Sequence, residues 1–451
     1  MSSTSQTLSR PVSFDPALVT GRKVVPLRIG FSWSFAGWVG YAACQWLMLS
    51  VMAKLGNSEI VGNFAFALAV SAPVFMLTNL QLRGVQSTDA LSEYTFSDYV
   101  TLRAIGSAIA VIAIAAICPF LRLTHAAVLA VLLVAVFKSL ESFSDIIAGL
   151  MQKFEMLDSA AVALLLRGGL SVTAFGIGFA LWRNLPRTLI LWIGTAALVI
   201  AVYDLRVARK LAAGEGGIHF RFNRNTLRKL AATSLPLGFV SALASFNTNI
   251  PRYTIERVLS VSDLGIFASI AYPVTAATIV ANSLGQSALA RLSRLFAERR
   301  FKEFQCLVWK LVAFGACLAG AAVVGVLTCG NWLLTALYRP EYARQGNLFV
   351  LLAITAGLNA TACFLSYALT AARQFRVQLP ISILCIVTTM SCSALFIPRF
   401  KLIGAALALL CSGMLLVAAA SIALVWVLKQ ARSSTTTVGE FVVAGYGGSV
   451  D

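Results

Sequence analysis

The sequence is short of charge. Only 12% of its 451 residues are Asp, Glu, Lys or Arg, and 59% are hydrophobic, whereas a soluble domain carries about a quarter charged residues. This deficit excludes a water-soluble globular protein. Apolar runs near the ~20 residues that cross a bilayer recur along nearly the whole chain, without the polar alternation of a β-barrel. The sequence therefore predicts an all-α integral membrane protein.

Several kinds of chemistry are also missing. The two histidines and nine scattered cysteines include no Cys-x-x-Cys pair, so we expect neither a metal site nor a disulfide framework. No Gly-x-x-x-x-Gly-Lys-Ser/Thr loop is present, which argues against bound ATP. No long outer loop carries the paired carboxylates that an integral-membrane glycosyltransferase would need. We therefore expect no cofactor, and interpret the protein as a secondary transporter rather than an enzyme.

About twelve apolar runs of membrane-spanning length follow one another. The first 28 residues carry four Lys or Arg residues and no signal-peptide core, so we expect a cytoplasmic tail. With this tail inside, the inner segments hold 25 Lys and Arg residues and the outer loops 10, in accord with the positive-inside rule. Both termini are then cytoplasmic. The predicted spans are 29–50, 60–82, 100–120, 125–147, 158–181, 187–205, 231–255, 264–288, 305–328, 346–370, 378–397 and 402–428.

The spans fall into two equal halves. Ser58-Glu59 followed by Gly62-Asn63-Phe64-Ala65 is echoed by Ser262-Asp263 followed by Gly265-Ile266-Phe267-Ala268, and each copy opens the second span of its half. Because six spans separate the copies, the halves share one orientation, as in transporters with parallel repeats. We predict two pseudo-symmetric six-helix bundles around a central cavity. The predicted parts are a cytoplasmic basic tail (1–26), an N-terminal bundle (27–205), a cytoplasmic linker (206–230), a C-terminal bundle (231–430) and a cytoplasmic tail (431–451).

Charged side chains inside the spans are the informative positions, because a charge at the bilayer centre costs roughly 2.5–3.5 kcal/mol on insertion scales. In span four, Lys138, Glu141 and Asp145 share one helical face. If the next hairpin turns near residue 154, Arg167 lies at the depth of Glu141, and we expect these two to pair. Two interpretations stay open. The group is either a structural ion pair, or it lines a cavity in which Glu141 and Asp145 couple ions and Arg167 binds an anion.

Span seven carries a second polar group. Pro251 lacks an N–H, and we expect it to interrupt the helix beside Asn249 and Arg252, as at transporter binding sites. Glu256, four residues after Arg252, is a further ion-coupling candidate. Alternatively, Arg252 and Glu256 extend to the membrane interface. Arg83, at the cytoplasmic end of span two, is either a gate residue able to meet a phosphate or a positive-inside anchor.

The formal charge of +18 is explained by this topology, so we expect no nucleic-acid partner. Asp204 and Arg206, which end span six, are interpreted as interfacial anchors. The basic stretch from Arg291 to Lys302 is expected to lie on anionic lipids of the inner leaflet, where each charge contributes about 1 kcal/mol.

Several short motifs match a known family. They are Gln45-Trp46, Ala53-Lys54-Leu55-Gly56, Val61-Gly62-Asn63-Phe64-Ala65, Pro73, Asn79 to Arg83, Thr88-Asp89, Glu141-Ser142, Asp145, Gly149 to Lys153, Arg167-Gly168, Ile250-Pro251-Arg252-Tyr253, Glu256 and Ala290-Arg291-Leu292. Over roughly residues 26–310 the chain thus resembles the bacterial Wzx-type oligosaccharide flippases of the multidrug/oligosaccharidyl-lipid/polysaccharide exporter superfamily. The resemblance implies a V-shaped pair of six-helix bundles in the bacterial inner membrane. It also implies an oligosaccharide substrate linked by pyrophosphate to undecaprenol, flipped from the inner to the outer leaflet with proton or membrane-potential energy.

This function is physically reasonable. A pyrophosphate and sugars cannot cross hydrocarbon unaided, whereas arginines in a hydrated cavity would bind the phosphates while the polyprenyl tail stays in lipid. The expected partners are therefore the lipid-linked oligosaccharide and membrane lipids, with a polysaccharide polymerase and a chain-length regulator. Two alternatives remain: a small-molecule cation or drug antiporter of the same superfamily, with an acidic and aromatic cavity, and a polytopic enzyme acting on lipid-linked sugars.

Overall fold

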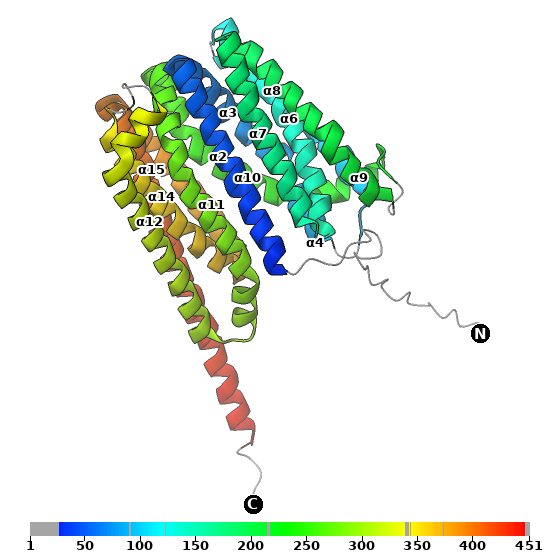
Figure 1. Ribbon diagram of the computed structural model, residues 1–451. Helices are drawn as coiled ribbons and strands as arrows, with labels where there is room; N and C mark the ends of the chain where they lie inside the picture. Colours follow the sequence, from blue (N-terminus) through cyan, green and yellow to red (C-terminus); the bar gives the residue numbers. More distant parts are fainter. Residues whose placement is uncertain are drawn as a thin grey trace, which may run out of the picture. The chain divides into compact units, whose positions relative to one another are not determined.

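A computed structural model describes residues 27–89, 92–121, 123–213, 217–338, 342, 344–372 and 374–446 of the chain. The predicted tail 1–26 and the last residues of the predicted C-terminal tail, from 447 on, lie outside the described residues. All regular elements in the described ranges are helical, as the sequence predicts (Figure 1). They are α2 (Leu27–Leu55), α3 (Ser58–Thr78), α4 (Leu82–Thr88), α5 (Phe96–Ile117), η1 (Cys118–Leu121), α6 (His125–Lys153), α7 (Leu157–Leu181), α8 (Leu185–Val199), η2 (Ile200–Asp204), α9 (Leu205–Ala212), α10 (Arg224–Val258), α11 (Val261–Ala297), α12 (Phe301–Leu337), α14 (Gly346–Ala371) and α15 (Phe375–Tyr446).

Polar caps set where several spans begin. Thr95 precedes α5 in a capping box, in which its hydroxyl accepts from the Asp98 N–H and the Asp98 carboxylate accepts from the Thr95 N–H at 3.0 Å. Thr124 caps α6, and Ser260 caps α11. Such caps pair N–H groups that have no partner inside the helix. The caps fix the residue at which each of these helices begins. The distance of a later side chain from that residue then gives its depth in the membrane.

The described residues include ten helical ranges long and apolar enough to cross a membrane, and the bent helix α11 supplies an eleventh candidate. One of the ten, Val377–Gln430 of α15, has 54 residues, more than twice the ~20 residues of one span. This range therefore holds two spans. Counted in this way, the described part of the chain offers twelve candidate spans, in line with the number that the sequence predicts.

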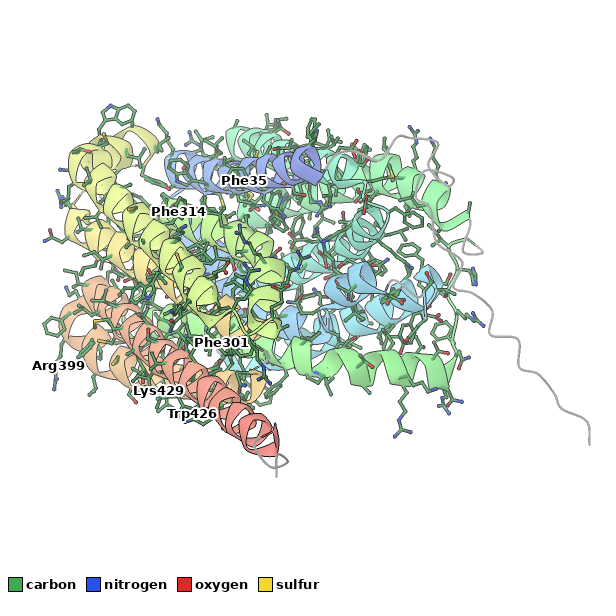
Figure 2. The ribbon with its side chains drawn as sticks, turned by 90° about the horizontal axis from the view of Figure 1, so that it is seen from below. Phe35, Phe301, Phe314, Arg399, Trp426 and Lys429 are labelled. Atoms are coloured by element: carbon green, nitrogen blue, oxygen red, sulfur yellow. The ribbon has the colours of Figure 1, made fainter. Side chains whose placement is uncertain are left out.

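The long helix α15 folds back on itself. Its backbone leaves the helical region at Lys401, with φ 52° and ψ −131°. The two arms then lie against each other, and the Ser412 hydroxyl donates to the carbonyl of Cys385 at 3.4 Å. Figure 2 shows Arg399 close to this turn and Lys429 far along the second arm. The turn separates predicted spans eleven and twelve.

The described chain forms two compact units, and they do not follow the order of the sequence. Unit 1 comprises residues up to 45, 74–178 and 186–242, and unit 2 comprises residues 46–73, 179–185 and 243 onward. The second part of α2 and most of α3 therefore belong to the same unit as the second half of the chain. Trp46 illustrates this, because its Nε1 donates to the Tyr338 hydroxyl at 2.7 Å.

The two copies of the sequence repeat meet inside unit 2. The hydroxyls of Ser58 and Ser262 share a hydrogen bond of 2.6 Å. A Cβ atom added at Gly62 would overlap the carbonyl of Val261, and one added at Gly265 would overlap the carbonyl of Ser58. Each glycine therefore lets the backbone of α3 and the backbone of α11 touch. The repeat, found as a pattern in the sequence, is a direct contact between its own two copies.

Each unit has its own apolar core. In unit 1, the buried Trp192 of α8 stacks on Phe137 of α6, with ring centroids 3.3 Å apart. Its Nε1 donates to the Ser171 hydroxyl of α7 at 2.8 Å. In unit 2, buried residues of α11, α12, α14 and the second arm of α15 form one cluster, which includes Phe304 and Leu365. The unit 1 core fixes α6, α7 and α8 relative to one another.

The segment predicted as a linker, 206–230, is largely helical, since α9 and the start of α10 take up most of it. Residues 217–223 are not helical but bind α5. The Arg221 N–H donates to the Thr101 hydroxyl at 2.9 Å, and the Ser97 hydroxyl donates to the Gly217 carbonyl at 3.2 Å. The basic residues between Arg291 and Lys302 lie at the adjoining ends of α11 and α12.

The contact between α3 and α11 should not tolerate a methyl group. We expect Gly62→Ala to lower the free energy of unfolding by about 1–3 kcal/mol, because the new Cβ forces two backbones apart. Thermal unfolding of the purified protein in detergent measures this. The control is Gly176→Ala in α7, where an added Cβ meets nothing within 4 Å and stability should change by no more than about 0.5 kcal/mol. Equal stability of the two variants would contradict the contact.

Candidate functional site

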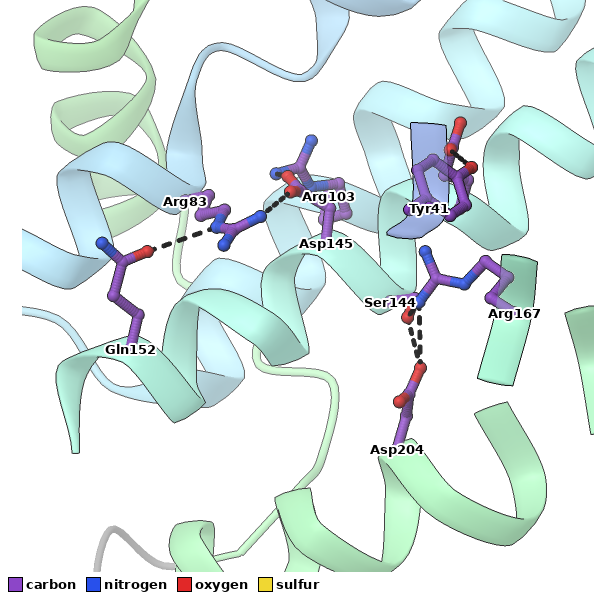
Figure 3. A network of polar contacts seen from close by, with 9 residues as sticks. Tyr41, Arg83, Arg103, Ser144, Asp145, Gln152, Arg167 and Asp204 are labelled. Carbon is purple, nitrogen blue, oxygen red and sulfur yellow. Dashed lines mark hydrogen bonds and ion pairs between the residues drawn. The ribbon is translucent and has the colours of Figure 1, made fainter. Parts of the chain in front are cut away.

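Helix α6 carries Ser144, Asp145 and Gln152, which take part in a network of polar contacts in unit 1 (Figure 3). Its charged face begins with Lys138 and Glu141 and continues through Asp145 to Gln152. The 3.6-residue period puts these side chains on neighbouring lines along the helix. Helices α2, α4 and α5 supply the groups that bind them.

Asp145 binds two arginines. One carboxylate oxygen accepts from Arg83 Nη1 of α4 at 3.2 Å, and the other accepts from Arg103 Nη2 of α5 at 3.2 Å. Arg83 also donates from Nε to Gln152 at 3.4 Å, and its Cζ lies 5.8 Å from the ring centroid of Trp38, within the range of a cation–π contact. Two guanidinium groups on one carboxylate leave the cluster with a net positive charge.

Arg83 and Arg103 differ in freedom. The Arg103 side chain is 1% exposed, and that of Arg83 is 22% exposed. Arg103 Nε and Nη1 have no hydrogen-bond partner among the described residues. A buried donor without a partner costs free energy, so these two N–H groups favour a bound acceptor. Arg103 is enclosed by protein, whereas part of the Arg83 side chain is accessible.

Sequence reasoning missed Arg103. The positive-inside count places it among the basic residues of the inner segments, although it falls within the predicted span 100–120. The missed signal is the capping box, since Thr95 and Asp98 start α5 at Phe96. Arg103 is then two turns inside a spanning helix, where an unpaired charge is costly.

A break in the backbone places Arg83. Helix α3 ends at Thr78 and α4 begins at Leu82, and between them Leu80 and Gln81 both have φ of 52°. This left-handed conformation is unfavourable for residues other than glycine. Gln81 is held by a hydrogen bond from its Nε2 to the Ser241 hydroxyl at 2.7 Å. The break gives Arg83 a short helix of its own.

The expected Arg167–Glu141 pair is wrong. Arg167 of α7 donates to the Ser144 hydroxyl, Ser144 donates to Asp204, and Arg167 Nη2 lies 3.5 Å from Asp204. Ser144 is one turn from Glu141, so the expected depth was nearly correct. Depth alone does not fix the direction of a side chain around its helix. Asp204, interpreted from the sequence as an interfacial anchor, is 1% exposed and is the partner of Arg167.

The segment that carries Asp204 is unusual. Residues Ile200–Asp204 form a turn of π-helix, η2, between α8 and α9. A π-turn holds more residues per turn than an α-helix and therefore rotates the side chains at its end. This turn ends at Asp204, which faces Arg167.

Glu141 has other partners. Lys138 Nζ donates to one of its oxygens at 2.6 Å, and the Tyr41 hydroxyl of α2 donates to the other at 2.9 Å. This i,i+3 pair lies within α6 itself. The ion-coupling roles suggested for Glu141 and Asp145 remain predictions.

In unit 2, the expected interruption at Pro251 does not occur. Helix α10 continues through this position to Val258, since one missing N–H can be compensated by neighbouring groups in a membrane helix. Arg252 Nη1 donates to Asn249 Oδ1 at 3.0 Å, and Asn249 is buried. Asn249 and Arg252 are thus brought together, and Glu256 lies one turn further along α10.

The observed pairing can be measured with double-mutant cycles. We expect Asp204→Leu to lower the free energy of unfolding by about 3–5 kcal/mol, because it leaves a buried guanidinium without its carboxylate. Adding Arg167→Met should restore most of this loss. The control cycle combines Arg167→Met with Glu141→Leu and should show little coupling. A larger coupling for Arg167 with Glu141 than with Asp204, in thermal unfolding, would contradict the observed pair.

Comparison with known proteins places the chain. Residues 32–296, more than half of the sequence, match the family of polysaccharide biosynthesis proteins. The capsular polysaccharide biosynthesis protein CapF of Staphylococcus aureus is 28% identical over 377 residues, which cover 84% of this chain and 94% of CapF.

Solved structures give the fold. A MATE transporter in complex with MaD3S has a TM-score of 0.62 at 14% identity, over 94% of this chain and 98% of that one. A MOP-superfamily transporter from Pyrococcus furiosus has a TM-score of 0.61 at 14% identity, over 93% and 97% of the two chains. The fold of this multi-pass membrane protein is therefore that of the MATE transporters. On its sequence match, the chain belongs to the polysaccharide biosynthesis protein family.

Proposed function

We propose that this protein is a secondary transporter that flips an undecaprenyl-pyrophosphate-linked oligosaccharide from the inner to the outer leaflet of the bacterial cytoplasmic membrane. The observation that carries the proposal is the pair of arginines on Asp145, of which Arg103 has two N–H groups without a partner in the described structure. Family membership supports a role in polysaccharide synthesis.

The chemistry of the cluster suits a phosphate. Guanidinium groups bind phosphate oxygens through paired, charge-assisted hydrogen bonds. Arg83 is partly exposed and has Asp145 and Gln152 as exchangeable partners. On binding, it would turn from Asp145 to the phosphate. Arg103 would then keep Asp145 paired, so that no carboxylate is left alone in a medium of low dielectric constant.

The other site residues take separate roles in this proposal. Arg167 is nearly buried in its contact with Asp204, which favours the structural interpretation of this arginine. Asn249 and Arg252 of α10 form a second polar pair that could contact the head group. Glu141, Asp145 and Glu256 are the carboxylates proposed to couple transport to ions.

The proposed topology follows the distribution of positive charge. Both termini lie in the cytoplasm, and residues 27–205 and 231–430 form the two repeats of the chain. In this orientation, Arg83 lies toward the cytoplasmic end of the span 58–88 and Arg103 toward that of α5, where a lipid-linked substrate made in the cytoplasm arrives. A polysaccharide polymerase and a chain-length regulator would receive the flipped product.

One alternative has an observation in its favour. The fold is shared with multidrug resistance transporters of the MATE family, which supports a small-molecule cation antiporter. A cation site would be lined with carboxylates. Here the single carboxylate of Asp145 is paired with two guanidinium groups, those of Arg83 and Arg103, so the cluster carries net positive charge. An enzyme acting on lipid-linked sugars is less well supported, because the family and the fold are those of membrane transporters.

A strain that lacks the protein tests the proposal. We expect lipid-linked oligosaccharide to accumulate on the cytoplasmic side, and Arg83→Gln or Arg103→Gln to restore less than a tenth of polymer synthesis, because the phosphate loses a charged donor. Lipid extraction with polymer quantification measures both. Arg228→Gln, on an exposed arginine of α10, is the control and should restore synthesis fully. Unchanged lipid-linked intermediates together with drug sensitivity would favour the antiporter.

A further inference from the structure

Unit 2 contains a cluster of neutral polar side chains on α11 and α14. Asn282 Oδ1 accepts from the Cys363 thiol at 3.3 Å and from the Tyr367 hydroxyl at 3.5 Å. Gln286, one turn after Asn282, lies on the same face of α11. The side chains of Asn282 and Gln286 are exposed. The cluster therefore offers two amides and a phenol on one surface.

The two helix segments that carry the cluster contain no charged residue. Helix α14 has no Asp, Glu, Lys or Arg, and α11 has none between Asp263 and Arg291. Arg291 marks the cytoplasmic boundary predicted by the positive-inside rule. Asn282 and Gln286 are within three turns of it, inside the membrane-spanning part of α11.

This position disfavours contact of the cluster with lipid. A polar group exposed to lipid loses its hydrogen bonds with water and costs several kcal/mol. Two exposed amides, i and i+4 on one helix face, would double this cost. Polar side chains in spanning segments accordingly face a hydrated space or another protein group.

The chemistry of the cluster matches a saccharide. Amides and phenols both donate and accept hydrogen bonds, as sugar hydroxyls do. An ionic ligand would be poorly served, because α14 and this stretch of α11 carry no charge. The arginine cluster of unit 1 has the opposite composition, with two guanidinium groups and one carboxylate.

We propose that Asn282, Gln286 and Tyr367 form a saccharide-binding subsite for the uncharged, hydroxyl-rich part of the transported lipid. This inference rests on the proposed function and divides recognition between two places: Arg83 and Arg103 bind the pyrophosphate common to all such lipids, and the neutral cluster binds the sugars that distinguish them. A site that hydrogen-bonds hydroxyl groups discriminates strongly against ligands that lack them.

Two lipids distinguish the subsite from the phosphate site. The first is undecaprenyl pyrophosphate, and the second is the lipid-linked oligosaccharide extracted from a strain that lacks this protein. Binding to the purified full-length protein in nanodiscs is measured for each. We expect the double variant Asn282→Ala/Gln286→Ala to weaken binding of the oligosaccharide lipid roughly tenfold and to leave undecaprenyl pyrophosphate binding within twofold. Arg83→Gln should weaken both.

Two further variants make the result decisive. Tyr367→Phe removes a single oxygen atom and should give a smaller loss for the oligosaccharide lipid alone. Asn359→Ala, on the side of α14 that faces Gly413 of α15, is the matched control and should change neither affinity. Equal weakening of both lipids by the double variant, or no change in either, overturns the subsite while leaving the proposed function in place. Failure of the unmodified protein to bind either lipid overturns both.

Discussion

A charged side chain in the membrane interior needs a partner or water. In unit 1, polar side chains of helix α6 are the partners of charged side chains on the neighbouring helices. Asp145 pairs with arginines of α4 and α5, and Ser144 links Arg167 of α7 to Asp204. Tyr41 of α2 is bound to the same helix through Glu141. The positions of several spans around α6 are therefore fixed by directional polar contacts, in a region where apolar packing alone discriminates poorly between arrangements.

Much of the fold could be predicted from the sequence, because the cost of placing polar groups in lipid makes spans visible as apolar runs. The pairing of charges could not. The hairpin between α6 and α7 gave the depth of Arg167 to within one turn, but not its direction around the helix. Its partner Asp204 lies on a π-turn that no sequence pattern predicted. Pro251 was expected to break α10, whereas this helix continues through it to Val258.

The repeat shows the value of a weak pattern at matching positions. Only a few residues are shared between the two copies, yet they include Gly62 and Gly265, where two backbones touch. The polar side chains of the two candidate sites, by contrast, differ between the two units. Arginines and carboxylates gather in unit 1, while α11 and α14 of unit 2 offer amides and hydroxyls. The two units thus contribute different chemistry, and side chains that look merely polar in the sequence acquire meaning only when the structure groups them.

The π-turn at Ile200–Asp204 accommodates one residue more than an α-helix of the same length would. Amino-acid composition does not reveal such an extra residue, but an alignment of homologous sequences would show it as a one-residue insertion. A homologue that aligns with α8 and α9 but lacks one residue between them would have a regular helix there, and its aspartate would point about 100° away from the arginine. A one-residue gap at this place should therefore coincide with loss of the basic or the acidic member of the pair, so that the history of the contact can be traced through insertions and deletions.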